Sequence, residues 1–244
     1  MRILFLAFVL YTFSSCSLQS LSRDRGLPKQ PLAPDEVASL ERELVASQQD
    51  SSRTIFGRLK VQYGRQTTTV RAVITPQRNE GYRVQILPLT SLSVLEEFLL
   101  SSEDMSVRDG RKTRTAEQIT GRDMFRAIGE LVSAEDTLSL LLGKIPRNMW
   151  NELQSQGSFF WSENKVIGAS RRTRLEAQTA QEKTRATLED VEISDRFREK
   201  PVLRFRYGGV REHEAGSYPE YVMVSILRRD IEIEFYPLKV RVAQ

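Results

Sequence analysis

Alternation of apolar and polar residues over three consecutive segments is the feature that most constrains this fold. Apolar or small side chains occupy every second position in 55–63, 70–74 and 82–86, with mostly polar residues between them. Gly64-Arg65 and the polar run 76–81 separate the segments and supply turns. A period of two with short turns predicts three antiparallel strands that have one apolar and one solvated face.

Further strands follow the same kind of pattern later in the chain. The polar segment 172–200 predicts strands with long exposed turns, and Asp109-Gly110 is a strong hairpin signal. The other predicted strands are 94–100, 105–108, 159–161, 203–207, 221–226, 231–235 and 238–242. A sheet with one apolar face needs a second layer to cover that face, so helices are expected to pack against it.

Three segments with helical spacing of apolar residues provide this cover. They are 35–48, 120–131 and 134–142. Ser133 and Asp136 form a capping box at the start of the third helix, and Gly143 and Pro146 are expected to end it. The order of strands, helical insertion and strands predicts an α+β domain over 35–244.

The N-terminus has the pattern of a secretory signal peptide. Arg2 precedes an apolar run, 3–11, and Cys16 follows it as the only cysteine of the chain. The run is too short for a membrane-spanning helix, which needs about 20 apolar residues. We therefore expect 1–15 to be a signal peptide and 16–34, with its three prolines, to be a flexible tether.

The residues before Cys16 resemble the lipobox of bacterial lipoproteins. Ser14 and Ser15 fit its small positions, whereas Phe13 stands where the family prefers leucine. The resemblance implies that Cys16 is lipidated and that the mature chain begins there. Ser17, rather than Asp, follows the cysteine, which in that family implies the outer membrane. The alternative is ordinary signal cleavage that leaves a spare thiol.

Sequence motifs for catalysis or metal binding are missing. His213 is the only histidine, in a polar turn between Glu212 and Glu214, and no nucleophile is singled out as its partner. The ligands of a zinc cluster and the glycine-rich loops that bind phosphate are not found. The sequence therefore predicts no enzyme, no catalytic residue, no metal site and no cofactor. Because 36 basic residues are interspersed with 32 acidic ones, nucleic-acid binding is not expected either.

Two leucines stand in the turn that follows the third predicted strand. Pro88 ends that strand, and Leu89 and Leu92 are surrounded by Thr and Ser. One interpretation is that these leucines pack on the protein itself. The other is that they are exposed and contact a membrane or an acyl chain.

Several short motifs, in this order and spacing, resemble the LolB family. They are GRLKV (57–61), VQILPL (84–89), the Asp109-Gly110 turn, LSLLLGKIP (138–146), FRYGGV (205–210) and YPEYVMV (218–224). LolB is an outer-membrane lipoprotein that receives lipoproteins from the periplasmic carrier LolA. The resemblance covers roughly residues 35–244. It implies an incomplete antiparallel β-barrel, that is, a curved sheet, with a helical lid over its apolar concave face.

This resemblance also implies a function. The chain would be anchored in the inner leaflet of the outer membrane, would bind lipid or the acyl chains of lipoproteins, and would help to insert lipoproteins that a LolA-like carrier delivers. The expected cavity lining is Leu59, Val61, Val70, Ala72, Val84, Ile86, Phe205 and Tyr207. The expected lid residues are Met124, Phe125, Leu138 and Leu141. In LolB a leucine of the turn after the third strand acts on the membrane, and Leu89 and Leu92 are the matching candidates.

A different class of function fits the same pattern. A structural or assembly lipoprotein would have a solidly packed core and would bind another envelope protein through its surface. An open apolar cavity of several hundred Å³ beneath the helices would separate the two hypotheses.

Overall fold

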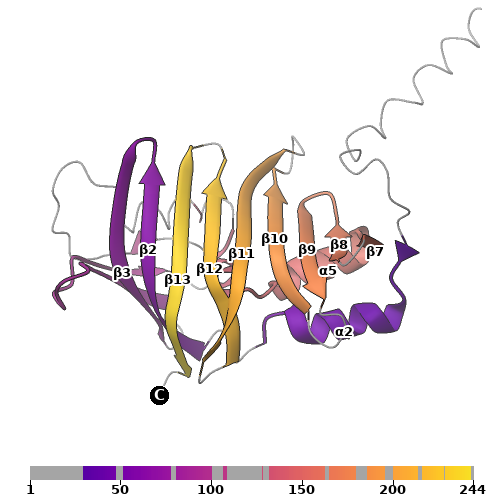
Figure 1. Cartoon of the computed structure of the whole chain (residues 1–244), viewed down its shortest axis with the longest axis horizontal. Helices are drawn as coiled ribbons and strands as arrows, with labels where there is room; N and C mark the ends of the chain where they lie inside the picture. Colours follow the sequence, from indigo (N-terminus) through magenta and orange to yellow (C-terminus); the bar gives the residue numbers. More distant parts are fainter. Residues whose placement is uncertain are drawn as a thin grey trace, which may run out of the picture.

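The structure is a computed structural model of the whole chain (Figure 1). The residues that it describes are 30–47, 52–77, 81–100, 107–108, 128, 132–162, 165–179, 186–195, 200–213, 216–227 and 229–242. Cys16, Met124, Phe125 and the predicted Asp109-Gly110 turn lie outside these ranges, and so does nearly all of the predicted helix 120–131. Within that helix Ile128 alone is described, and it is helical and buried.

One antiparallel sheet dominates the described residues. Its strands are β1 (Gln30–Pro31), β2 (Arg53–Tyr63), β3 (Gln66–Gln77), β4 (Gly81–Leu87), β5 (Glu96–Leu100), β6 (Val107–Arg108), β7 (Ser158–Ser162), β8 (Lys165–Ala169), β9 (Thr173–Thr179), β10 (Ala186–Ser194), β11 (Pro201–His213), β12 (Gly216–Ile226) and β13 (Ile231–Val242). Their order is β1-β7-β8-β9-β10-β11-β12-β13-β2-β3-β4-β5-β6. The C-terminal strand β13 therefore joins the two halves by pairing with β2.

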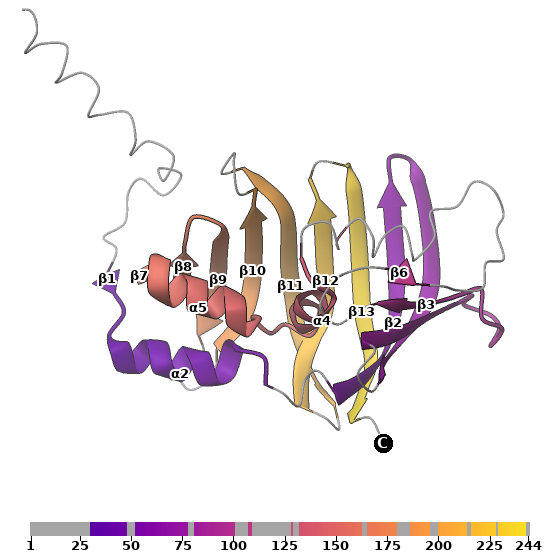
Figure 2. The same ribbon diagram turned by 180° about the vertical axis from the view of Figure 1, so that it is seen from behind.

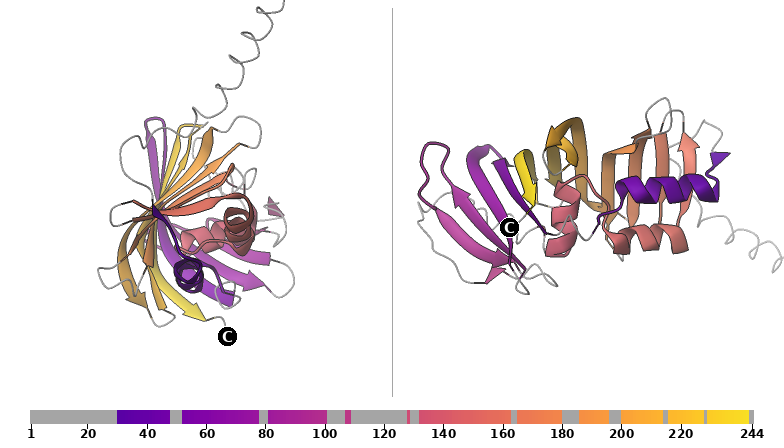
Figure 3. Two further views of the ribbon diagram at one scale, coloured as in Figure 1. Left: turned by 90° about the vertical axis from the view of Figure 1, so that its right-hand side faces the viewer. Right: turned by 90° about the horizontal axis from the view of Figure 1, so that it is seen from below.

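The sheet is open and strongly curved, and Figure 3 shows it curling around the helices. Register shifts interrupt the pairing at Leu188/Asp190, Ile193/Ser194 and Pro237/Lys239, and such bulges increase local twist and bending. The third shift makes one bulged strand, β13, of the two segments that the sequence predicted separately. The predicted curved sheet with helices on its apolar face is confirmed.

Two helices cover the concave face beside β7–β10 (Figure 2). They are α2 (Pro34–Leu44) and α5 (Arg147–Gln156). Helix α2 begins with Pro34 at a position where its missing N–H costs nothing, and Glu36 accepts the N–H of Ala33 at 3.0 Å. It ends four residues earlier than predicted, at Leu44. Because β1 pairs with β7, the sheet takes up residues 30–31, which the sequence assigned to the tether.

Helix α5 was not predicted from the sequence. Gly143 and Pro146 were interpreted only as the end of the preceding helix, although a proline is also a common first residue of a new one. Pro146 is the N-terminal flanking residue of α5, and only Trp150 and Leu153 of this helix are buried. The Trp150 ring lies 5.0 Å from the ring of Phe159 on β7.

Helix α4 (Ala134–Leu141) lies over the middle of the sheet (Figure 2). The predicted cap is confirmed, because the Ser133 hydroxyl accepts the N–H of Asp136 at 3.1 Å. Gly143 follows the helix with φ +71°, which favours glycine. No helix among the described residues is long and apolar enough to span a membrane.

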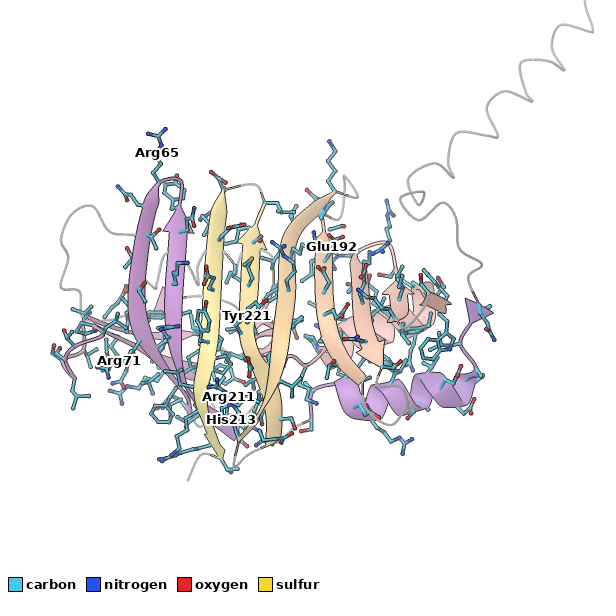
Figure 4. The ribbon with its side chains drawn as sticks, in the orientation of Figure 1. Arg65, Arg71, Glu192, Arg211, His213 and Tyr221 are labelled. Carbon is cyan, nitrogen blue, oxygen red and sulfur yellow. The ribbon has the colours of Figure 1, made fainter. Side chains whose placement is uncertain are left out.

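The convex face of the sheet carries polar side chains (Figure 4), of which Glu192 and Tyr221 are labelled. Ion pairs join neighbouring strands here, as in Lys60–Glu234 at 2.6 Å and Arg204–Asp190 at 2.6 Å. Hydrogen bonds from Lys60 and Tyr236 lower the pKa of Glu234. Burial raises the pKa of Asp190, an effect larger than that of the nearby Arg204 guanidinium, which lowers it. These contacts describe a largely solvated face on which the carboxylate of Asp190 is buried.

Candidate functional site

The inner face of the sheet brings together the residues that were predicted to line a cavity. Phe205 stands opposite Val224, and Tyr207 stands opposite Val222, on the neighbouring strand. At the other end of the row Leu59 stands opposite Val70. Residues directly opposite each other in an antiparallel pair project to the same face. Because the row continues through β12 and β13 to β2, β3 and β4, all eight predicted residues lie on this face.

Most of these eight residues are packed in the core. Six are buried and at most 6% exposed: Leu59, Val61, Ala72, Val84, Ile86 and Phe205. Val70 and Tyr207 are partly buried and pack against the same cluster. Gly57 allows the packing to be this close, since a Cβ atom there would lie 2.2 Å from the Phe235 ring.

The lid leucines that the structure describes lie on α4. Leu138 is 5% exposed and Leu141 is 2% exposed, and both belong to the same core cluster. Leu140 and Leu142 beside them are buried too. Helix α4 therefore covers the inner face and is tightly packed against it. The other two predicted lid residues, Met124 and Phe125, lie outside the described residues.

A pocket of about 260 Å³ opens where the ends of α2 and α4 meet the sheet. We call it the helix-end pocket. Its lining consists of residues 42–44, 142–144, 186–188 and 217–219 with Tyr207, Gly209 and Val210 of β11. Of the predicted cavity residues Tyr207 alone lines it; the other seven lie outside its lining.

The two helix ends above this pocket are tied to each other. The N–H of Ile145 donates to the carbonyl oxygen of Leu44 at 2.7 Å, and the N–H of Ala46 donates to that of Ile145 at 2.9 Å. Lys144 Nζ donates to the carbonyl oxygen of Glu43 at 2.6 Å. These bonds join segments about a hundred residues apart, which explains why sequence patterns did not indicate the pocket.

Two glycines shape the walls of the helix-end pocket. A Cβ at Gly143 would lie 3.0 Å from Pro219 Cδ, so the turn after α4 closely approaches β12. Gly209 has φ +61°, and a Cβ there would lie 2.7 Å from a carboxylate oxygen of Glu220. Both positions therefore favour glycine, and larger residues would strain the walls.

Three charged residues, Arg42, Glu43 and Lys144, belong to the lining of the pocket. Arg42 Nε donates to the carbonyl oxygen of Ala38 at 3.4 Å, and the carboxylate of Glu43 accepts the N–H of Ala186. Tyr207 also lines the pocket, but its hydroxyl oxygen is buried away from solvent and has no hydrogen-bond partner among the described residues. Burial raises the pKa of this phenol well above its ordinary value, with a further contribution from the charge of Asp190.

The β4–β5 loop (88–95) exposes the two leucines of the predicted membrane contact. Leu92 is 83% exposed and Leu89 is 49% exposed. Arg71, on the outer face of β3, holds the loop by donating to the carbonyl oxygens of Pro88, at 3.0 Å, and Ser91. The hydroxyl groups of Ser91 and Ser93 lie 2.7 Å apart. Leu92 therefore does not pack on the protein itself, whereas Leu89 is half-exposed; a role of either leucine at a membrane remains a prediction.

Two other features lie outside the helix-end pocket. A second pocket of about 270 Å³ has a mixed lining that includes Val132, Met149 and Ile193, and among its polar residues Asn148 donates to Asp136 at 2.8 Å. His213 is the last residue of β11 rather than a turn residue, and its ring lies 5.7 Å from that of Tyr218. Desolvation, and then the charge of Arg211, lower the pKa of His213. The described residues contain no group of three or more His, Cys, Asp or Glu placed to hold a metal ion.

No protein-family model matches the chain, and no curated protein matches it. Solved structures similar to it include a LolA superfamily protein from Nitrosomonas europaea, at 12% identity and a TM-score of 0.47, over 86% of this chain and 93% of that one. Another is a DUF1329 family protein from Desulfovibrio piger, at 9% identity and a TM-score of 0.45, over 85% and 90%.

A third similar structure is a putative outer membrane lipoprotein-sorting protein domain from Vibrio parahaemolyticus. Its identity to this chain is 10% and its TM-score is 0.38, over 84% of this chain and 90% of that domain. At identities this low, these three structures do not place the chain in a family.

Proposed function

We propose that this protein is a lipid-anchored envelope protein of the LolB type that holds acyl chains between its curved sheet and its helices and helps to insert lipoproteins into the outer membrane. Cys16 would carry the anchor, and two or more acyl chains there would make it stable. A periplasmic LolA-like carrier would deliver the cargo.

The observation that carries the proposal is the helix-end pocket. It lies on the same side of the sheet as the continuous apolar inner face, and its lining mixes the apolar side chains of Leu44, Leu142 and Leu188 with polar and charged ones. Each methylene group removed from water stabilises a complex by about 0.8 kcal/mol, without any need for a particular sequence in the cargo. Such an interaction suits a protein that accepts many lipoproteins.

The volume of the pocket defines how cargo would enter. At about 260 Å³ it is somewhat smaller than pockets that enclose a drug-sized ligand, which start near roughly 300 Å³. In this form it accommodates a segment of one acyl chain. Longer chains would have to displace the leucines of α4, such as Leu138 and Leu141, from the inner face. The proposed lid is therefore α4, which opens as cargo enters.

The exposed leucines of the β4–β5 loop support the membrane part of the proposal. A leucine that stays exposed lacks the roughly 1.5–3 kcal/mol that its burial would contribute. Leu92 is such a leucine, in the middle of a loop that Arg71 holds in place. A loop held in this way presents an apolar side chain that can enter the interfacial region of a bilayer. The loop would release or guide acyl chains into the membrane.

One observation favours the second candidate, a structural lipoprotein that binds another envelope protein. Six of the eight predicted cavity residues are buried in a packed core. If α4 does not open, the pocket alone offers little room for acyl chains. The protein would then act through its surface.

Binding of an apolar fluorescent probe separates the two candidates. The full chain with Cys16→Ala should be soluble and should bind 1-N-phenylnaphthylamine, which lauric acid should displace. Bulky or charged substitution of Ala72 should weaken probe binding if the inner face opens. A folded chain that binds no probe would instead support the structural candidate. Membrane fractionation of Cys16→Ala tests the anchor, because this variant should leave the membrane fraction.

A further inference from the structure

We propose that the outer face of β2, β3, β12 and β13 is a docking surface for a protein partner that presents an acidic segment. Tyrosine and arginine side chains form a row across these strands, and basic side chains outnumber acidic ones around it. This surface lies on the opposite side of the sheet from the helix-end pocket, so the inference does not depend on the proposed function.

Four outward-facing side chains follow one another across the sheet. The Tyr221 ring lies 6.2 Å from the Tyr236 ring on the next strand. Tyr236 stands opposite Arg58, and Arg58 stands opposite Arg71. Their neighbours along each strand belong to the buried inner face, so these four side chains share the outer face. Figure 4 labels Tyr221 and Arg71, the two ends of this row. We call the four residues the outer row.

Arg58 is exposed and is already oriented by its neighbour. Its guanidinium carbon lies 4.6 Å from the centre of the Tyr236 ring. In the described part of the chain, no oxygen atom accepts a hydrogen bond from this guanidinium. A guanidinium stacked on a ring keeps N–H groups available for two parallel hydrogen bonds to one carboxylate. Because the stack holds the side chain in place, less conformational freedom is lost when a partner binds.

The Tyr236 ring is itself held by hydrogen bonds. Its hydroxyl donates to one carboxylate oxygen of Glu234 at 2.5 Å, and Lys60 Nζ donates to the other at 2.6 Å. The carboxylate of Glu234 is therefore bonded to two groups other than Arg58. The ring platform is fixed, and the cation above it stays available for a carboxylate from outside.

The charge around the outer row is predominantly positive. The outward-facing charged side chains of β2, β3 and β13 are the basic Arg58, Lys60, Arg71, Lys239 and Arg241 and the acidic Glu232 and Glu234. Arg58 and Arg71 stand directly opposite each other, an arrangement that is unfavourable for two like charges. Carboxylates supplied by a partner would complement this charge and relieve the repulsion.

The composition of the surface favours a polypeptide over an anionic bilayer. Tyrosine and arginine are the residue types that are enriched at protein interfaces and that contribute most to their affinity. Glu232 is exposed on the same face, where it would oppose the approach of an anionic bilayer. An extended acidic segment suits a flat row, because every second side chain of a strand points to the same side.

Arg58→Ala is the central variant, and Arg65→Ala is its matched control. Both changes remove one exposed arginine, but Arg65 lies in the turn between β2 and β3, away from the outer row (Figure 4). In the full chain with Cys16→Ala, fluorescence polarisation would measure the binding of a labelled peptide of alternating Glu and Ser. A peptide with Gln in place of Glu controls for charge, and phosphatidylglycerol vesicles are the membrane probe.

We expect the parent chain to bind the Glu peptide and not the Gln peptide. Arg58→Ala should weaken Glu-peptide binding roughly 5- to 30-fold, as for a residue at the centre of an interface, and Arg65→Ala less than about twofold. Arg58→Lys should restore only part of the affinity, because an ammonium group neither stacks flat nor pairs with a carboxylate through two parallel hydrogen bonds. Tyr221→Ser should weaken binding more than Tyr63→Ser, since Tyr63 is exposed but lies outside the outer row.

Three results would overturn the inference. The first is that the folded parent chain does not bind the Glu peptide. The second is an equal loss of peptide binding in Arg58→Ala and Arg65→Ala, which would mean that the peptide responds only to net charge. The third is binding to phosphatidylglycerol vesicles that Arg58→Ala weakens while it leaves peptide binding unchanged, because the outer row would then face a lipid surface.

Discussion

Helix α4 and the β4–β5 loop are both rich in leucine, and the structure places their leucines in opposite environments. Leu138 and Leu141 of α4 are at most 5% exposed, whereas Leu92 of the loop is 83% exposed. Leu138 and Leu141 are three positions apart in the helix and therefore share one face, while the loop separates its leucines with serine and threonine. The same residue type therefore stabilises the fold in one segment and stays available for a partner in the other.

The two segments differ in the free energy that their proposed movements would cost. A lid must leave the inner face, and each buried leucine of α4 opposes that movement by the free energy of its burial. A loop with exposed leucines needs no such rearrangement to reach a membrane. Cargo entry would therefore cost more free energy than contact of the β4–β5 loop with the bilayer.

The largest expected effect is that of Leu141→Ala. Removal of this buried side chain should lower the free energy of unfolding by about 2–5 kcal/mol, because the lost burial is accompanied by a cavity. Chemical denaturation of the chain with Cys16→Ala measures it. The matched control is Leu92→Ala, which should change stability by less than about 0.5 kcal/mol. If both variants lost a similar free energy of unfolding, the leucines of the helix and of the loop would not differ in how they stabilise the fold.

Sequence patterns predicted the part of the fold that depends on local periodicity. The strands around Leu59, Ala72 and Val84 and the Ser133 cap were predicted because alternation and capping are encoded in adjacent residues. The exposed position of Leu92 was one of two open alternatives, because its serine-rich neighbours fit either.

The candidate site was predicted less well. The helix-end pocket depends on hydrogen bonds between Ile145 and the end of α2, and no local pattern signals a contact over that distance in the chain. The sequence correctly placed Tyr207 on the inner face, but its unpaired hydroxyl is a property of the packed structure. Helix α5 was missed because Pro146 was interpreted only as the end of the preceding helix, and not as the start of a new one that buries Trp150 and Leu153.

A smaller effect on stability is expected for Arg71→Ala. The variant loses the hydrogen bonds from the guanidinium to the carbonyl oxygens of Pro88 and Ser91, and the half-exposed site should reduce the cost to about 1 kcal/mol. The loop should then present Leu92 less well, so binding to anionic vesicles should weaken. Arg71→Lys keeps the charge without the forked geometry and should show the same weakening. Full binding by Arg71→Lys would mean that charge, rather than the fixed loop, contacts the membrane.

The smallest effect on stability, and the sharpest effect on function, is expected for Leu92→Glu. Because the side chain is already solvated, a carboxylate there should shift the melting temperature by less than about 2 °C. If the loop enters the interfacial region of the bilayer, the charge should abolish vesicle binding and lipoprotein insertion. Leu227→Glu is the control, since Leu227 is a leucine 49% exposed in a different turn, between β12 and β13. Equal losses of vesicle binding in both variants would point to general repulsion from the membrane, and a large loss of stability in Leu92→Glu alone would show that the loop packs on the protein in solution.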